Sequence, residues 1–97
     1  MTFRYVLPQN WVDKVSHEME EFANGGAQVT IKTKSGAVFE KVLISNSMWL
    51  VAARGYKDLP FAVDDIVEIY QTDEDKNPSE RGNWDFWDEW PKPGSPV

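Results

Sequence analysis

The chain has 97 residues, of which 41% are hydrophobic, and a formal net charge of −6. This length fits one domain with a modest core, and the absence of cysteine excludes disulfides and thiolate metal sites and fits a reducing compartment. The acidic balance argues against a general nucleic-acid binder, because phosphate affinity depends on clustered Lys and Arg. No apolar run approaches the roughly 20 residues of a membrane span, and the first residues lack the pattern of a signal peptide. We therefore expect a soluble, cytoplasmic protein with no membrane partner.

The first predicted element is an amphipathic helix that starts after Asn10. Asn10 is a good N-cap, and Asp13 suits the first turn, where the helix dipole favours acids. Apolar side chains then recur at helical spacing, at Trp11, Val12, Val15, Met19, Phe22 and Ala23. Asn24, Gly25 and Gly26 predict its end, because glycine accepts the left-handed conformation found after helices.

Five short strands are expected after the helix. Val29, Ile31 and Thr33 alternate with Thr30, Lys32 and Lys34, and this period of two predicts a half-buried strand. The other four strands are expected over residues 38–44, 48–53, 59–63 and 66–70. Turns are expected at Gly36 and at residues 45–47, and a polar loop over 54–58. The pattern predicts a mostly-β fold, in which an N-terminal helix precedes a five-stranded small barrel.

Composition divides the chain near Thr72. Residues 1–71 carry nine acidic and seven basic side chains, whereas residues 72–97 carry seven and three. We predict a folded body over 1–71 and an acidic, Trp-rich tail over 72–97. The acidic residues at the start of the tail, Asp73, Glu74 and Asp75, are interpreted as a solvated linker.

Two stretches of the body resemble the motifs of the Sm-like small β-barrel family, and the resemblance covers residues 10–70. The first runs from Gly36 through Val42-Leu43-Ile44 to Asn46-Ser47-Met48-Trp49-Leu50. In the second, over residues 61–69, Asp64, Ile66 and Ile69 match the family pattern. The resemblance implies a five-stranded barrel and a homo-oligomeric ring. An SH3-like barrel would give a similar strand pattern.

The RNA-contacting positions of the family are not matched. The family's Asp falls near Asn46, its Asn on Trp49, and its Arg-Gly pair on Ala62 and Val63. The resemblance therefore implies the fold and does not carry RNA binding to this chain.

A ring of this kind pairs the fourth strand of one subunit with the fifth strand of the next. Both expected strands are short and apolar, and they would leave exposed edges in a lone subunit. The candidate subunit interface is Leu59, Phe61, Val63, Ile66, Val67 and Ile69. The alternative is that these strands pair within one closed barrel.

A basic patch is the feature that supports RNA as a partner. Two lysines share one strand face, and a tyrosine could stack on a base beside an arginine. The candidate contact residues are Lys32, Lys34, Asn46, Arg54, Tyr56 and Lys57. The alternative is an ordinary charged strand face and loop.

The tail holds tryptophans at every third position, with acids between them. Candidate docking residues are Trp84, Phe86, Trp87 and Trp90. They would bury on the chain's own barrel or a neighbouring subunit, or dock on another protein, since aromatic anchors dominate interface energetics. A third interpretation is an acidic mimic of nucleic acid that blocks an enzyme.

Few side chains of this chain could act as a nucleophile or a general base, because it has one histidine and no cysteine. His17 falls on the polar face of the expected helix. We predict a non-catalytic assembly module without a cofactor, which forms a homo-oligomeric ring and contacts another macromolecule. The alternative is a small acidic inhibitor or adaptor of the kind that phages and other mobile elements encode.

Overall fold

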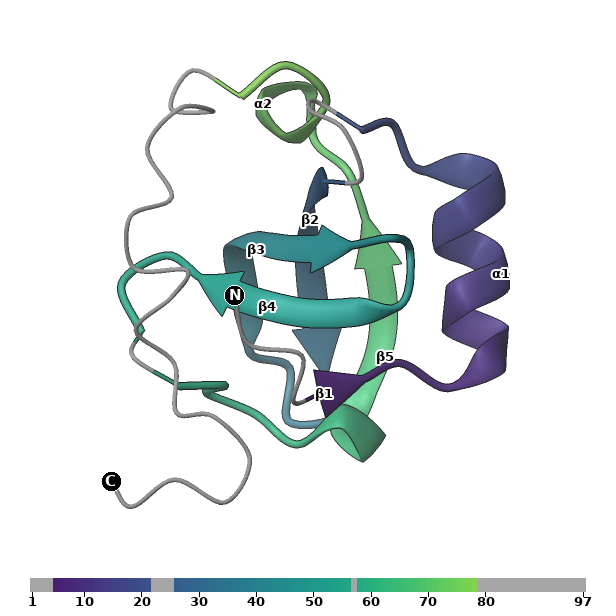
Figure 1. Ribbon diagram of the computed structural model, residues 1–97. Helices are drawn as coiled ribbons and strands as arrows, with labels where there is room; N and C mark the ends of the chain where they lie inside the picture. Colours follow the sequence, from purple (N-terminus) through teal and green to yellow (C-terminus); the bar gives the residue numbers. More distant parts are fainter. Residues whose placement is uncertain (1–4, 22–25, 57, 79–97) are drawn as a thin grey trace.

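The computed structural model describes residues 5–21, 26–56 and 58–78. The elements are β1 (Tyr5–Val6), α1 (Gln9–Glu18), β2 (Gly26–Thr33), β3 (Val38–Ser45), β4 (Trp49–Ala53), the 3₁₀ turn η1 (Val63–Asp65), β5 (Ile66–Tyr70) and α2 (Asp73–Lys76). The strands pair antiparallel in the order β1-β4-β3-β2-β5. Figure 1 shows the sheet curled into a half-barrel with α1 at its side. The predicted mostly-β architecture with a preceding helix is confirmed, and β1 and β5 form the two edges of the sheet.

Helix α1 starts one residue before the predicted cap. Pro8 is the N-cap residue, and its carbonyl accepts hydrogen bonds from the backbone N–H groups of Trp11 and Val12, both at 3.0 Å. Asn10 lies inside the helix and is exposed, so the prediction that it caps the helix is wrong. Pro8 has φ −57° and ψ 155°, so it lies just outside the helix, where its missing N–H removes no helical hydrogen bond.

The helix also ends earlier than its apolar spacing predicts. The backbone becomes extended at Met19. Glu20 N–H donates to Gln71 Oε1 at 2.8 Å, and Gln71 Nε2 donates to the carbonyls of Glu20 at 2.8 Å and of Gln28 at 3.0 Å. A side chain distant in sequence thus satisfies both backbone groups of Glu20, which competes with continuation of the helix. The expected helix end at Asn24, Gly25 and Gly26 is wrong, because α1 ends at Glu18 and Gly26 is the first residue of β2. Phe22, Ala23, Asn24 and Gly25 lie outside the described residues.

Both predicted hairpin turns are confirmed. Gly36 adopts φ +88°, and its N–H donates to the carbonyl of Thr33 at 2.9 Å. Asn46 and Ser47 adopt φ +54° and +62°, the signs that a tight turn matched to strand twist requires. These turns set the register in which β2, β3 and β4 pair.

The main core lies on one face of the sheet. Cross-strand rows such as Val29–Val42–Ala53 and Ala27–Ile44–Leu50 place apolar side chains on this face. Val15 of α1 is buried against them, and Trp11 and Val12 pack at the margin. This face therefore uses the helical stripe that the sequence predicts.

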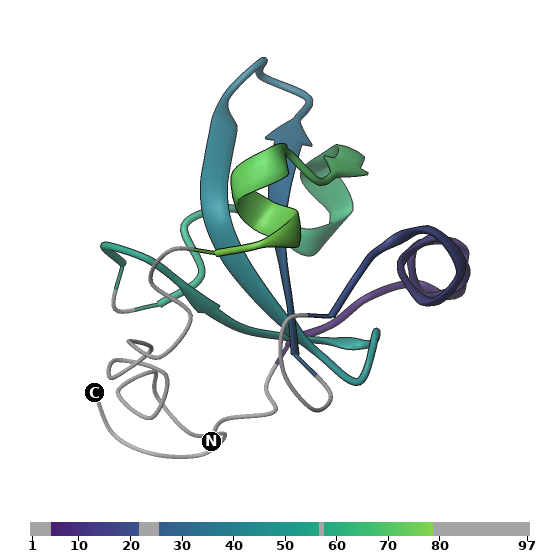
Figure 2. The same ribbon diagram turned by 90° about the horizontal axis from the view of Figure 1, so that it is seen from above.

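The opposite face of β2 is covered as well, which the alternation does not predict. Gln28 and Thr30 are 1% exposed, because α2 lies against β2 on this side (Figure 2). Asp75 of α2 accepts hydrogen bonds from Gln28 Nε2 and Thr30 Oγ1, both at 2.8 Å. The interpretation of residues 73–75 as a solvated linker is wrong for Asp75, which is 2% exposed.

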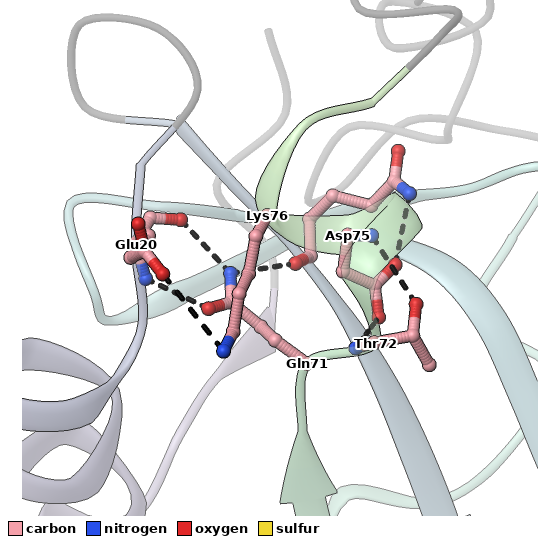
Figure 3. Close-up of polar contacts among 6 residues, drawn as sticks. Glu20, Gln71, Thr72, Asp75 and Lys76 are labelled. Carbon is pink, nitrogen blue, oxygen red and sulfur yellow. Dashed lines mark hydrogen bonds and ion pairs between the residues drawn. The ribbon is translucent and has the colours of Figure 1, made fainter.

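A capping box starts α2, as Figure 3 shows. Thr72 Oγ1 accepts from the Asp75 N–H at 3.2 Å, and the Thr72 N–H donates to Asp75 Oδ2 at 3.0 Å. Lys76 Nζ lies 4.0 Å from Glu20 Oε2 at the surface, where an ion pair adds little to stability. The folded body of the protein therefore extends past Thr72 to Pro78 among the described residues.

Residues 59–63, predicted as a strand, do not form one. Leu59, Phe61 and Val63 are half-buried against the main core, and Val63 begins the turn η1. Pro60 lies in this run and has no N–H to contribute to a strand ladder. The prediction followed the alternation of apolar residues and did not take this into account. The two-residue strand β1 was not predicted at all; it pairs with β4 through Tyr5↔Leu50 and Val6↔Trp49.

Candidate macromolecular interface

A tight turn after β4 holds Tyr56 at the surface. Gly55 adopts φ +92°, and the Tyr56 N–H donates to the carbonyl of Ala53 at 3.0 Å. The Arg54 N–H donates to the carbonyl of Lys41 on β3 at 3.1 Å. The loop backbone is therefore fixed to two strands, and Tyr56 remains 45% exposed.

Three aromatic rings from separate parts of the chain meet at this turn. The Tyr56 ring meets Phe39 edge-on at 6.0 Å between centroids and 67° between planes. Phe39, at the start of β3, lies 5.0 Å from Phe61, and both phenylalanines pack against the main core. We call the set Phe39, Arg54, Tyr56 and Phe61 the Tyr56 surface.

The far side of the loop is anchored to the edge strand β1. The hydroxyl of Tyr5 donates to Asp58 Oδ1 at 2.6 Å, and the Leu59 N–H donates to the same oxygen at 2.7 Å. Asp58 thus connects the loop to β1, 53 residues away in the sequence. These contacts limit the freedom of the loop that presents Tyr56.

The structure divides the predicted RNA-contact set. Arg54 and Tyr56 share the turn that follows β4, whereas Asn46 lies in the turn at the other end of β4. Lys34 Nζ lies 4.0 Å from Asp65 Oδ1. Lys32 on β2 stands directly opposite Glu68 on β5 in the strand register. Lys57 lies outside the described residues. Acidic neighbours thus offset the two strand lysines, which weakens the patch as a phosphate site.

Most of the predicted subunit interface belongs to the core of the chain. Ile66 and Ile69 are buried, and Leu59, Phe61 and Val63 are half-buried against the same cluster. Val67, on the edge strand β5, is 48% exposed. An interface built from this set would therefore rest on the β5 edge and Val67.

The other sites predicted from the sequence have less structural support than the Tyr56 surface. The candidate docking residues Trp84, Phe86, Trp87 and Trp90 lie outside the described residues. His17 is exposed on α1, and its Nδ1 lies 2.7 Å from the carbonyl oxygen of Asp13. In the described part of the chain, no group of three His, Asp or Glu side chains is placed to hold a metal ion. No helix in that part is both long and apolar enough to cross a membrane.

The sequence predicted Arg54 and Tyr56 as contact residues, but it did not predict the two phenylalanines that support the Tyr56 ring. Phe39 was assigned to a strand, and Phe61 to a subunit interface. Their meeting depends on the curl of β3 and the path of residues 58–62, which no local pattern encodes. Comparison of the chain with protein-family models, curated proteins and solved structures finds no match.

Proposed function

We propose that the chain is a non-catalytic binding module that contacts a protein partner through the Tyr56 surface. The observation that carries the proposal is the exposed Tyr56 ring, packed edge-on against Phe39 and held by a hydrogen-bonded turn. Tyrosine and arginine are enriched among residues that dominate binding energy. A ring that is already held in place loses little freedom when it binds.

A protein partner fits the charges better than RNA does. Lys32 and Lys34 have Glu68 and Asp65 beside them, and the chain carries a net charge of −6. Phosphate binding needs several uncompensated cations, because it gains free energy from released counterions. An exposed tyrosine ring on a firmly held turn is typical of a protein–protein hot spot.

The test places a photo-crosslinking side chain at position 56 in the protein's native cells. Matched controls carry the same group at Val67 and Val6, which are 48% and 50% exposed against 45% for Tyr56. The proposal expects a defined crosslinked protein at position 56 that the two controls do not capture. The captured protein is then purified, and its affinity for the chain is measured with Tyr56→Ala and Val67→Ala variants.

Tyr56→Ala should weaken this binding roughly 30-fold, the equivalent of a hot-spot contribution of about 2 kcal/mol, while Val67→Ala leaves it unchanged. Equal crosslinking from all three positions, or unchanged affinity of Tyr56→Ala, would overturn the proposal. Binding of a single-stranded RNA oligonucleotide that depends on Tyr56 and falls steeply with salt would favour RNA instead.

A second candidate function is self-assembly through the sheet edges. β5 and β1 are the two edge strands, and each carries a valine that is about half exposed, Val67 at 48% and Val6 at 50%. Pairing of β5 in one copy with β1 in the next is a heterologous contact that could close a ring. It would replace the pairing expected from residues 59–63, which do not form a strand.

Light scattering over a range of concentrations tests this second candidate. Lysine on an edge strand opposes pairing, so Val67→Lys and Val6→Lys should each dissociate a β1–β5 ring. A two-fold β5–β5 dimer would respond to Val67→Lys alone. A monomeric wild type at every concentration would remove the self-assembly candidate and leave the Tyr56 proposal standing.

A further inference from the structure

Strand β3 contains one residue more than its partner β2 over the same stretch of the sheet. Val29 on β2 pairs with Val42 on β3. Two residues further along β2, Ile31 pairs with Phe39, which lies three residues before Val42. Between them, Lys41 adopts φ +55°. An extra residue in one strand of an antiparallel pair is a β-bulge, which bends its strand and increases the local twist.

The backbone conformation of Lys41 is unfavourable for a residue with a side chain. At positive φ the Cβ atom crowds the backbone, and glycine and asparagine tolerate this conformation best. The other described residues with a positive φ lie in turns, namely Gly36, Asn46, Ser47 and Gly55. Among the described residues, Lys41 is therefore the one that holds this conformation inside a strand.

The alternation of side chains does not require the extra residue. Phe39 and Val42 both pack in the main core. Without Lys41 they would stand two positions apart, the spacing that places side chains on one face of a regular strand. The bulge therefore changes the path of β3 and leaves the facing of its side chains as a shorter strand would have it. Strained backbone of this kind is concentrated at functional sites, where the surrounding structure holds it in place.

The bulge lies where β3 reaches the Tyr56 surface. β4 ends at Ala53, and the N–H of the next residue, Arg54, donates to the carbonyl of Lys41 at 3.1 Å. Figures 1 and 2 show β3 curving along its length. The turn after β4 then places the Tyr56 ring 6.0 Å from the ring of Phe39. The bend in β3 thus precedes the contact between the two rings by two residues.

We propose that the bulge at Lys41 positions the Tyr56 surface, because it bends β3 so that the Phe39 ring supports the Tyr56 ring. Lys41 acts through its backbone in this role, and its side chain need not touch a partner. The consequence for binding rests on the proposed function of the Tyr56 surface. A ring held by a neighbour loses little freedom on binding, so partner affinity should depend on the bulge.

NMR and urea denaturation of two full-length variants test the positioning role. Deletion of Lys41 removes the bulge and keeps the facing of Phe39, whereas Lys41→Gly keeps the bulge and relieves the strain at positive φ. Nuclear Overhauser contacts between the ring protons of Phe39 and Tyr56 should persist in the wild type and in Lys41→Gly and disappear in the deletion variant. The urea midpoint of Lys41→Gly should exceed that of the wild type.

Ring contacts that persist after the deletion of Lys41 would overturn the inference and leave the proposed function standing. If the deletion variant does not fold, Lys41→Gly decides alone. Retained ring contacts with a higher urea midpoint then support the inference, and lost contacts or a lower midpoint overturn it.

The affinity for the protein that is crosslinked at position 56 tests the consequence for binding. Deletion of Lys41 should weaken this affinity about tenfold or more, and Lys41→Gly should retain it. Lost ring contacts with unchanged affinity, or retained contacts with weakened affinity in Lys41→Gly, would overturn a role of the bulge in binding. Failure to capture any protein at position 56 would overturn the proposed function, and the ring contacts would still decide whether the bulge positions Tyr56.

Discussion

Thr30 Oγ1 on β2 lies 2.8 Å from Asp75 Oδ2 on α2, and both side chains are buried. The other carboxyl oxygen of Asp75 accepts from Gln28 Nε2 at 2.8 Å. This pairing joins a four-residue helix to β2, which lies between β3 and β5 in the sheet, although the helix is too short to be stable alone.

Asp75→Ala should lower the free energy of unfolding by about 3 kcal/mol, because it removes several hydrogen bonds and leaves the buried donors of Gln28 and Thr30 without partners. Asp73→Ala is the matched control: Asp73 lies on the same helix and is exposed. It should lose only about 0.5 kcal/mol, through the helix dipole. Urea denaturation measures both, and equal losses would contradict a structural role for the buried carboxyl group.

Gln71→Ala should lower the free energy of unfolding by about 2 kcal/mol, since Gln71 makes three hydrogen bonds to the backbone of Glu20 and Gln28. Hydrogen exchange of the Glu20 amide should be at least about tenfold faster in this variant than in the wild type. Gln9→Ala removes one exposed bond to Asp13 and should change stability by less than about 0.5 kcal/mol. An unchanged Glu20 amide would show that Gln71 does not hold this segment.

Gly55→Ala should cost about 1–2 kcal/mol, because φ +92° is strained for any residue with a Cβ. An added Cβ would meet nothing within 4 Å, so the loss is one of backbone conformation. Gly36→Ala, at φ +88°, should cost about as much stability. Only the change at Gly55 should also weaken binding of the partner captured at Tyr56, measured by titration, because only Gly55 shapes that turn. Weakening by both variants would trace the effect to stability alone.

Ile69→Ala should lower the free energy of unfolding by about 3 kcal/mol, since Ile69 is completely buried and its truncation leaves a cavity. Val67, on the same strand, is 48% exposed, and Val67→Ala should change stability by less than about 0.5 kcal/mol. Thermal unfolding measured at several protein concentrations distinguishes a loss of core packing from the loss of a subunit contact. If Ile69 lay in a subunit interface, the stability lost in Ile69→Ala would depend on protein concentration.

The elements predicted from sequence are those with local signals. Gly36 and the Ser45-Asn46-Ser47 run gave both hairpin turns, and the stripe through Trp11, Val12 and Val15 gave the helix. Alternation and apolar runs gave β2, β3, β4 and β5 to within a few residues. The strand predicted over residues 59–63 is wrong because their alternating apolar side chains resemble those of a strand, although Pro60 argues against one. For the site, Arg54 and Tyr56 followed from residue type, whereas Phe39 and Phe61 did not.

By itself, the sequence determined the mostly-β class, the leading helix and the tight turns, because these depend on propensities and periods within a few residues. The tertiary structure decided where α1 stops, why Asp75 is buried and which rings meet Tyr56. Gln71 and Glu20 are 51 residues apart, Asp75 and Thr30 are 45 apart, and Tyr5 and Asp58 are 53 apart. Such contacts form only when the curled sheet brings distant segments together. Their hydrogen bonds then override the local preferences of the residues involved.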